Sequence, residues 1–419
     1  MRALLGVSDR TGLVELARGL SHQGVELVAT DGTRRALLDA GIEATSVSHL
    51  TGLPEMLDGR VKTLHPAIHA GILARRDRPE HMAQLGSRGF LPIDIVVVSL
   101  YPFAEAVARG AEFEETVENI DIGGPTMIRA AAKNHDSVAV VVRHEQYPLL
   151  LEELARDGCV SASTRRRLAA EAFALTAAYD TAVAGWFRQE TAASGVAPVY
   201  SVGGPLLHEL RYGENPHQHG ALYAVPGVPG GVANATQVQG GPLSFTNWLD
   251  VDAACRLVCD VDEPAAAVIK HTNPCGVAVA EDISAAYARA YDCDPRAAYG
   301  GIVGLNRRLD LATARLLSRT FLEAVICRGL DDDAAELLRA RERLRVLTLG
   351  GPSCAGDLDV RSIDGGLLVQ SQDWVATSRG EMRVATSRQP DDAQWRDLLL
   401  AWRVCRHVKS NAVVIVRDG

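Results

Sequence analysis

Short apolar runs alternate with longer segments of helical periodicity through the first half of this 419-residue chain. The runs occupy positions 3–7, 25–29, 95–98 and 138–142, and a polar or glycine-bearing turn follows each of them. This alternation predicts βαβ units that build a parallel sheet. Because ligands of such sheets bind beyond the carboxyl ends of the strands, the residues directly after each run are the candidates for chemistry.

The periodicity also divides the chain into domains. Residues 163–190 are rich in alanine and carry apolar side chains at helical spacing, which predicts one long helix, whereas residues 191–198 have no period. We therefore place a boundary there and expect one domain over 1–195 and a second over 200–419. In the second domain, positions 265–270 and 413–416 are expected strands.

Composition limits the class of protein. The formal net charge of −9 argues against a nucleic-acid-binding protein, because binding to a phosphate backbone requires a basic excess. The eight cysteines form no C-x-x-C pair, which favours reduced thiols. No apolar stretch has the length of a membrane span or the layout of a signal peptide. We expect a soluble cytoplasmic protein without nucleic-acid or membrane partners.

The first candidate site begins at the turn formed by Thr30, Asp31, Gly32 and Thr33, between a predicted strand and a predicted helix. Its backbone N–H groups, two hydroxyls and the helix N-terminus could converge on one phosphate. The same four residues are also typical of an ordinary helix cap. Because a carboxylate would repel a phosphate, we expect Asp31 to turn away and cap the helix.

Cations and glycines follow in two further segments. Arg60 and Lys62 alternate with apolar neighbours, so an extended strand would point both side chains the same way. Gly123 and Gly124 precede a predicted helix and would let the backbone approach a ligand. Each segment alone is equally typical of a solvated surface turn.

Four reactive side chains occupy corresponding places in the first domain. Lys62, Tyr101, Asp121 and Lys133 each lie beside a predicted strand end or helix start. Two amines, a phenol and a carboxylate in one cleft would suit an anionic substrate and proton transfer. The sequence therefore predicts one shared site around them.

Longer matches indicate a family. Residues 8–13, 59–66, 99–103, 119–124 and 130–134 resemble the cyclohydrolase half of the bifunctional purine biosynthesis enzymes, which combine aminoimidazole carboxamide ribonucleotide (AICAR) transformylase with IMP cyclohydrolase. The resemblance implies an α/β fold, in which a methylglyoxal-synthase-like parallel-sheet domain precedes an incomplete, cytidine-deaminase-like transformylase domain. It also implies that 5-formamidoimidazole-4-carboxamide ribonucleotide closes to IMP with loss of water.

By this resemblance, the catalytic residues of ring closure are Lys62, Tyr101, Asp121 and Lys133. The lysines would stabilise an oxyanion and supply protons, because an ammonium group suits both roles. Asp121 would accept the carboxamide proton, and Tyr101 would hydrogen-bond the reacting centre. The substrate-binding residues that the resemblance implies are Ser8, Arg10, Thr30, Gly32, Thr33, Arg60, Thr63, Ile122, Gly123 and Gly124.

Residues 210–218 and 268–276 resemble the transformylase half, in which AICAR takes a formyl group from 10-formyltetrahydrofolate. The resemblance implies that His271 removes the amine proton, while Lys270 keeps the imidazole neutral and stabilises the oxyanion. No second cysteine or His-x-Glu pair completes a zinc motif, so we expect no metal. The other implied site residues are Arg211 and Tyr212, which would hold the nucleotide, and the active-site asparagine, Asn411.

Several features depart from the family pattern. Ala29 and Asp31 replace a serine and a glycine of the family loop, and Arg10 stands where lysine is usual. Family members continue well beyond the position of Gly419, so we expect a truncated transformylase domain with weak formyl transfer. Two alternatives stay open, namely a non-catalytic methylglyoxal-synthase-like ligand-binding module and a fragment whose C-terminal half serves to dimerise. We otherwise expect a homodimer that acts on small ribonucleotides.

Overall fold

The computed structural model describes residues 1–57, 59–191, 197–225, 228, 230–351, 358–373 and 377–419. It divides into two compact units, the first made mainly of Met1–Pro205 and the second of Leu206–Ala224 and Val228–Gly419. Much of the predicted boundary at 191–198 lies outside the described residues, because 192–196 are not among them.

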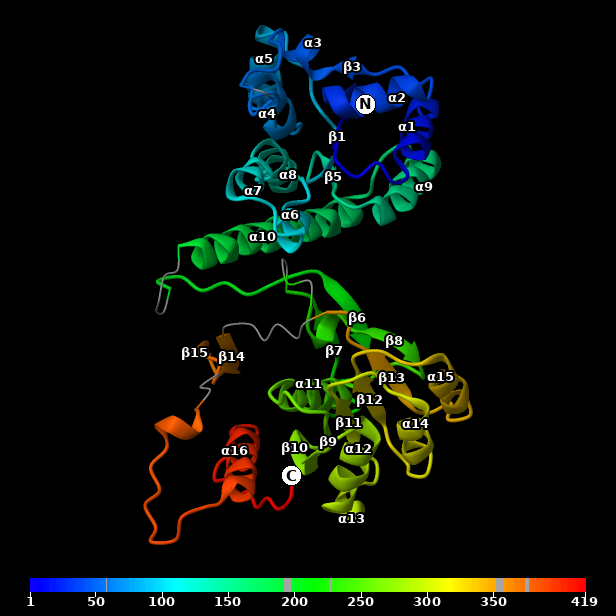
Figure 1. Cartoon of the computed structure of the whole chain (residues 1–419). Coiled ribbons are helices and arrows are strands. Elements are labelled where there is room, and N and C mark those ends of the chain that lie inside the picture. The colour runs from blue at the N-terminus through cyan, green and yellow to red at the C-terminus, as the bar shows by residue number, and fades with distance from the viewer. Residues whose placement is uncertain (58, 192–196, 226–227, 229, 352–357, 374–376) are drawn as a thin grey trace. The chain divides into compact units, whose positions relative to one another are not determined.

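A five-stranded parallel sheet with the strand order β3-β2-β1-β4-β5 forms the centre of the first unit (Figure 1). The four predicted strands are confirmed. The short edge strand β3 was not predicted, because two residues are too few to show a period. The strands are β1 (Arg2–Val7), β2 (Glu26–Ala29), β3 (Thr45–Ser46), β4 (Ile95–Ser99) and β5 (Ala139–Val141).

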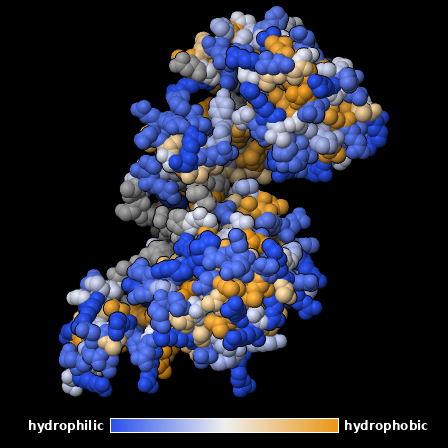
Figure 2. Space-filling view, turned by 45° about the vertical axis from the view of Figure 1, so that its right-hand side comes forward, coloured by the Kyte–Doolittle hydropathy of each residue, from blue (hydrophilic) through white to orange (hydrophobic). Residues whose placement is uncertain are grey.

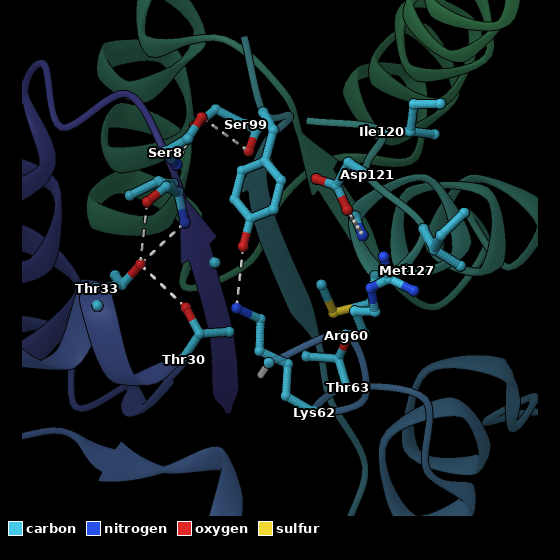
Figure 3. Close-up of a pocket in the computed structure, with 18 of the residues that line it drawn as sticks. Ser8, Thr30, Thr33, Arg60, Lys62, Thr63, Ser99, Ile120, Asp121 and Met127 are labelled. Atoms are coloured by element: carbon cyan, nitrogen blue, oxygen red, sulfur yellow. Dashed lines mark hydrogen bonds between the residues drawn. The ribbon is translucent and has the colours of Figure 1, made fainter. Parts of the chain in front are cut away.

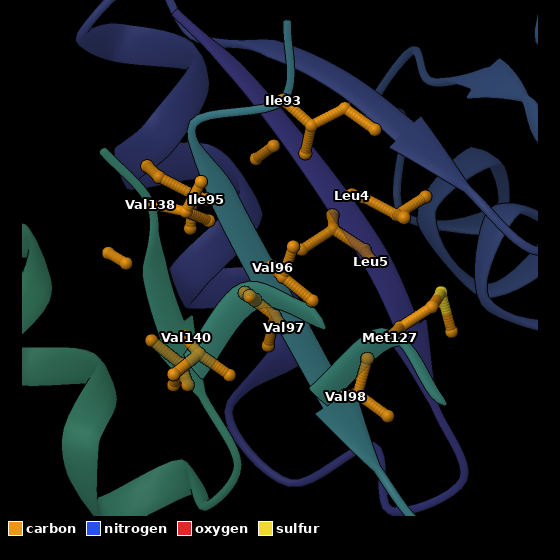
Figure 4. Packing of buried hydrophobic residues seen from close by; sticks show 14 of the residues in the cluster. Leu4, Leu5, Ile93, Ile95, Val96, Val97, Val98, Met127, Val138 and Val140 are labelled. Carbon is orange, nitrogen blue, oxygen red and sulfur yellow. The ribbon is translucent and has the colours of Figure 1, made fainter. Parts of the chain in front are cut away.

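Helices cover this sheet, and its central strands are fully buried. Leu4, Leu5, Val96 and Val97 are at most 1% exposed, and Met127 packs against the same cluster (Figure 4). A strand buried on both faces needs consecutive apolar residues, which is why these strands read as runs and not as alternation. The helices are α1 (Leu13–His22), α2 (Asp31–Asp39), α3 (Val47–Thr51), α4 (Pro66–Leu73), α5 (Pro79–Ser87), α6 (Phe103–Ala108), α7 (Phe113–Glu118), α8 (Gly123–Lys133), α9 (Tyr147–Asp157) and the predicted long helix α10 (Ala162–Glu190).

The second unit contains a mixed six-stranded sheet with the order β10-β9-β11-β12-β13-β8. Strands β11, β12 and β13 run parallel, and the other neighbours are antiparallel. These strands are β8 (Thr236–Gln239), β9 (Ala265–Lys270), β10 (Asn273–Val279), β11 (Ile302–Leu305), β12 (Ala324–Cys327) and β13 (Arg345–Thr348). Two separate hairpins pair β6 (Leu206–Leu210) with β7 (Gly220–Tyr223) and β14 (Leu358–Ile363) with β15 (Gly366–Ser371).

Helices also cover both faces of the second sheet. Helix α11 (Phe245–Cys259) belongs to one apolar cluster, and α12 (Ile283–Asp292), α14 (Leu311–Leu317) and α15 (Asp332–Arg339) belong to another. The α/β fold class is therefore confirmed in both units. The remaining helices of this unit are α13 (Pro295–Ala298) and α16 (Asp392–Arg406).

The predicted strand at 413–416 is wrong. Val414 and Val416 pack against an apolar cluster around α16, whereas Val413 and Ile415 are 87% and 91% exposed. The alternation of buried and exposed side chains that predicted a strand is therefore present, but the segment joins no sheet within the described residues. A half-buried extended segment and a strand share the same side-chain period.

Three observations concern the surface and the thiols. The face seen in Figure 2 is mainly hydrophilic, with hydrophobic residues in scattered groups. Within the described ranges, no helix combines the length and apolar character that crossing a bilayer requires. Cys159, Cys275, Cys293, Cys327 and Cys405 are free thiols, and Cys354 lies outside the described residues.

Candidate functional site

A cavity of about 610 Å³ opens at the carboxyl ends of β1 and β4 (Figure 3). This is the edge of a parallel sheet at which ligands bind. The predicted residues that line it are Ser8, Arg10, Thr30, Gly32, Thr33, Arg60, Lys62, Thr63, Tyr101, Asp121, Ile122, Gly123 and Gly124. Glu55, Ser99, Glu118 and Met127 also line the cavity, although sequence reasoning did not select them.

Lys62 and Tyr101 form a hydrogen-bonded pair inside this cavity. The Lys62 Nζ donates to the Tyr101 hydroxyl oxygen at 3.0 Å, and Figure 3 shows the Lys62 side chain extending into the cavity. Burial acts to lower the pKa of Lys62, but the bond to Tyr101 and the charges of Glu55 and Asp121 outweigh it and raise that pKa. Lys62 is therefore held as a cation, and its ammonium group donates to the Tyr101 oxygen, so the Tyr101 O–H is directed elsewhere in the cavity.

Asp121 faces the same cavity from the residues just before α8. Its Oδ1 accepts the Gly124 backbone N–H at 2.8 Å. Burial raises the pKa of Asp121, and hydrogen bonds from the backbones of Gly124 and Tyr101 offset only part of that effect. A carboxylate with a raised pKa binds a proton more readily than an exposed one, which suits a base.

A tyrosine from the long helix α10 fixes the backbone at Asp121. The Tyr179 hydroxyl accepts the Asp121 N–H at 2.7 Å and donates to the Asn119 carbonyl at 3.1 Å. Burial raises the pKa of Tyr179 to about 12, so it remains protonated and able to donate. Sequence reasoning missed Tyr179, because this residue belongs to no motif and lies on a helix whose sequence pattern was interpreted only as packing.

The two glycines at the start of α8 serve protein packing. A Cβ on Gly123 would lie 2.6 Å from the Thr63 Oγ1, and one on Gly124 would lie 2.5 Å from the Asp121 Oδ2. Both glycines line the cavity, and their predicted role of letting the backbone approach a ligand stays a prediction. Because neither glycine has a Cβ, the side chains of Thr63 and Asp121 have room beside them, and these two side chains line the cavity.

The turn at the start of α2 differs in part from the prediction. Thr33 is buried, and its Oγ1 accepts the Val7 N–H at 3.0 Å, so this hydroxyl fixes the end of β1. The N-cap of α2 is Thr30, and Asp31 is the exposed first residue of the helix. The expectation that Asp31 caps the helix is therefore wrong, although Asp31 does not line the cavity. Gly32 and the helix N-terminus remain at its wall.

Arg60 does not lie on an extended strand. Its segment is a turn with one isolated bridge between Met56 and Val61. The Arg60 guanidinium forms an ion pair with Glu118, at the end of α7. The predicted strand is therefore wrong, because the described residues of this segment form a turn that the Met56–Val61 bridge closes upon itself.

Lys133 does not share the cavity. It is the exposed last residue of α8 and lies in a separate depression with Arg129, His135 and Phe173. At about 1.5 Å of rise per residue, the helix carries Lys133 roughly 15 Å from its first residue. The structure thus brings together three of the four predicted catalytic residues of ring closure.

Three candidate residues of the second unit, Lys270, His271 and Asn411, lie at or beside the β9–β10 hairpin. The Lys270 Nζ donates to the Tyr299 carbonyl at 2.9 Å, and His271 is exposed in the turn that follows. The Lys409 N–H donates to the Asn273 Oδ1 at 3.3 Å, which places the segment of Asn411 beside this hairpin. On another hairpin, the guanidinium of Arg211 lies 5.9 Å from the ring centre of Tyr212. Among the described residues, no group of three or more His, Cys, Asp or Glu is arranged to hold a metal.

Lysine usage is a further signal in the sequence. The chain has four lysines, Lys62, Lys133, Lys270 and Lys409, and its other basic cations are arginines. An ammonium group is a compact charge whose pKa shifts readily, whereas a guanidinium is planar and always charged. A lysine in such an arginine-rich chain indicates chemistry that arginine cannot replace. This signal selects all four lysines, Lys62 and Lys270 among them, without any family resemblance.

Comparison with known proteins gives the family. An MGS-like domain model matches residues 12–126, and a model described as the AICARFT/IMPCHase bienzyme matches residues 131–419. Proteins described as bifunctional purine biosynthesis protein PurH match all of this chain and 80% of their own length, with 51% identity in Roseobacter denitrificans and 48% in Rhodospirillum rubrum. The solved structure of ForH matches 45% of this chain and 98% of its own, with 37% identity and a TM-score of 0.40. The chain belongs to the AICARFT/IMPCHase bienzyme family.

Proposed function

We propose that this protein carries out two steps of purine biosynthesis. The first is ring closure of 5-formamidoimidazole-4-carboxamide ribonucleotide to IMP, and the second is formyl transfer from 10-formyltetrahydrofolate to AICAR. Relatives named as bifunctional purine biosynthesis proteins match the whole chain, which supports both activities. We assign ring closure to residues 1–195 and formyl transfer to residues 200–419.

The observation that carries ring closure is the meeting of Lys62, Tyr101 and Asp121 in one cavity. The carboxamide nitrogen of the substrate attacks the formyl carbon, and the carbonyl electron pair moves to oxygen. Asp121 takes the proton that the nitrogen loses, and the ammonium of Lys62 stabilises the oxyanion. The oxygen takes one proton from the Tyr101 hydroxyl and a second from the protonated Asp121, and it leaves as water. The formamide nitrogen forms the new C=N bond and loses its own proton, which restores the Tyr101 hydroxyl.

The other end of the cavity suits the phosphate of the ribonucleotide. The N-terminus of α2 at Gly32 presents backbone N–H groups, which favour an anion. Arg10 adds a positive charge there, because its Nη2 lies 3.5 Å from the Gly32 carbonyl. Local cations are needed, since the chain as a whole carries a formal charge of −9.

Formyl transfer would use the β9–β10 hairpin. The AICAR amine is weakly nucleophilic, because its lone pair is delocalised into the ring. His271 accepts the proton that this amine loses as it attacks the formyl carbon, and Lys270 stabilises the oxyanion that forms. The oxyanion then re-forms the carbonyl group, the folate nitrogen leaves with the proton that His271 took up, and the formyl group remains on the amine.

Ring closure is tested with purified chain and the formylated substrate, followed by the absorbance of IMP. We expect Lys62→Ala to abolish turnover, and Lys62→Arg to bind substrate but turn over slowly, because a guanidinium cannot occupy the same position beside Tyr101. Arg18→Ala, an exposed cation on α1, is the matched control for loss of charge. Binding without IMP formation by the parent chain would favour the alternative of a ligand-binding module.

Formyl transfer is tested on the same preparation with AICAR and 10-formyltetrahydrofolate. We expect His271→Ala to abolish transfer and to leave ring closure unchanged, because the two sites lie in separate units. The weak transfer expected from the sequence stays a prediction, and the rate of the parent chain decides it. Transfer by His271→Ala at the parent rate would refute the assignment of the base.

We also propose that the protein works in the cytoplasm as a homodimer. The free thiols of Cys159, Cys275, Cys293, Cys327 and Cys405 fit a reducing compartment. The exposed apolar residues Phe113 and Phe187, which contact each other near the end of α10, fit a surface that a second copy covers. Light scattering tests the dimer, and a monomeric mass at micromolar concentration would exclude it.

A further inference from the structure

The hairpin between β9 and β10 turns through only two residues. Lys270 pairs directly with Asn273, so His271 and Thr272 form the whole connection. Their φ angles are 55° and 61°, which places both in the left-handed region. Such turns normally use asparagine, aspartate or glycine. A β-branched threonine there is strongly disfavoured, so the local sequence does not favour this turn by itself.

One buried carboxylate binds both residues of the turn. Asp250, on α11, is 7% exposed, and its Oδ1 accepts the Thr272 N–H at 2.6 Å. Its Oδ2 accepts the His271 N–H at 3.3 Å. Hydrogen bonds to an ionised oxygen are stronger than neutral ones. Asp250 lies outside the hairpin, and its two hydrogen bonds therefore stabilise a turn that the local sequence does not favour.

Burial of the turn's own side chains does not explain its positive φ angles. His271 is exposed at the tip of the hairpin, while the neighbouring Lys270 is fixed by its bond to the Tyr299 carbonyl. Backbone strain that the surrounding structure enforces is characteristic of functional sites. An exposed imidazole on a restrained backbone beside a fixed ammonium is what a positioned base requires.

We infer that Asp250 is a positioning residue for formyl transfer, which holds the His271–Thr272 turn and thereby places the imidazole of His271. The inference rests on the proposed role of His271 as the base. Asp250 acts through two backbone amides and does not touch the substrate. A merely structural Asp250 would affect the stability of the second unit but not the turnover of the folded protein.

The first test compares Asp250→Ala with Asp252→Ala in the full chain. Asp252 lies on the same helix but pairs with Arg256, so it is a matched control. We expect Asp250→Ala to lower the kcat of formyl transfer about 100-fold, because misplacement of a catalytic group by about 1 Å has that effect. The KM for AICAR and the rate of ring closure should stay the same, and Asp252→Ala should change neither activity. An Asp250→Ala kcat within about twofold of the parent would overturn the inference.

The second test is rescue by glycine. Glycine adopts positive φ freely, so Thr272→Gly relieves the turn of its need for Asp250. We expect the double variant Asp250→Ala, Thr272→Gly to recover about tenfold of the lost kcat. No recovery would mean that Asp250 acts in another way.

Amide hydrogen exchange separates this inference from the proposed function. We expect the N–H groups of residues 271 and 272 to exchange faster in Asp250→Ala, whether or not the parent chain transfers formyl groups. If the parent transfers none, the proposed function of this unit fails, while the exchange rates still decide the role of Asp250. Unchanged exchange at both amides would exclude it as the restraint of this turn.

Discussion

Replacing Tyr179 with phenylalanine removes the oxygen atom that holds the backbone at Asp121, a residue that lines the first cavity. That oxygen accepts the Asp121 N–H at 2.7 Å and donates to the Asn119 carbonyl at 3.1 Å. At about 1 kcal/mol for each bond, the first unit should lose about 2 kcal/mol of stability. The unpaired Asp121 N–H, if water does not reach it, raises the loss to about 3 kcal/mol. The aromatic ring and its edge contact with Phe103 stay in place, so no large cavity forms.

The effect on ring closure should exceed the effect on substrate binding. Tyr179 holds the backbone that carries Asp121, so its loss should lower the kcat about 10- to 100-fold with little change in KM. Urea unfolding followed by circular dichroism gives the stability, and initial rates of IMP formation give the kinetics.

The matched control for this experiment is Tyr287→Phe. The Tyr287 hydroxyl is buried in the second unit and has no hydrogen-bond partner among the described residues, so its removal should cost almost nothing. A Tyr179→Phe enzyme with the parent kcat, or a Tyr287→Phe chain that is destabilised equally, would refute the reasoning.

Three further outcomes follow from the same structure. Burial raises the pKa of Asp121 above its ordinary value of 3.8. As the pH is lowered, the kcat of ring closure should therefore begin to fall at a pH above 3.8, because the base becomes protonated. A fall that begins only at or below pH 3.8 would count against Asp121 as the base. By linkage, this carboxyl stabilises the fold most at low pH, and its contribution is lost as the pH rises through the raised pKa. Thr33→Val should lower the free energy of unfolding by about 1–2 kcal/mol, because the Thr33 hydroxyl accepts the Val7 N–H. The KM of ring closure should stay nearly unchanged, and a large rise in KM would instead indicate that Thr33 contacts the substrate. Treatment with EDTA should leave both activities unchanged, and a loss that zinc restores would contradict the metal-free mechanism.

The site illustrates how far sequence reasoning reaches. Lys62, Tyr101 and Asp121 could be predicted, because each is a reactive side chain beside a strand end or helix start, and strand ends of a parallel sheet meet at one edge. Lys133 looked equally good in the sequence, yet it lies at the far end of α8 from the cavity. Sequence position near a motif says nothing about which end of a helix faces a ligand.

What the sequence determined by itself was the order and type of the elements around the first site. Continuous apolar runs are typical of strands that are buried on both faces, and helical periodicity requires one packed face, so those predictions depend on local pattern alone. Only the tertiary structure decided which distant residues meet. Tyr179 and Asp250 act on backbone amides far away in the chain, and no local pattern encodes a hydrogen bond between segments that folding brings together.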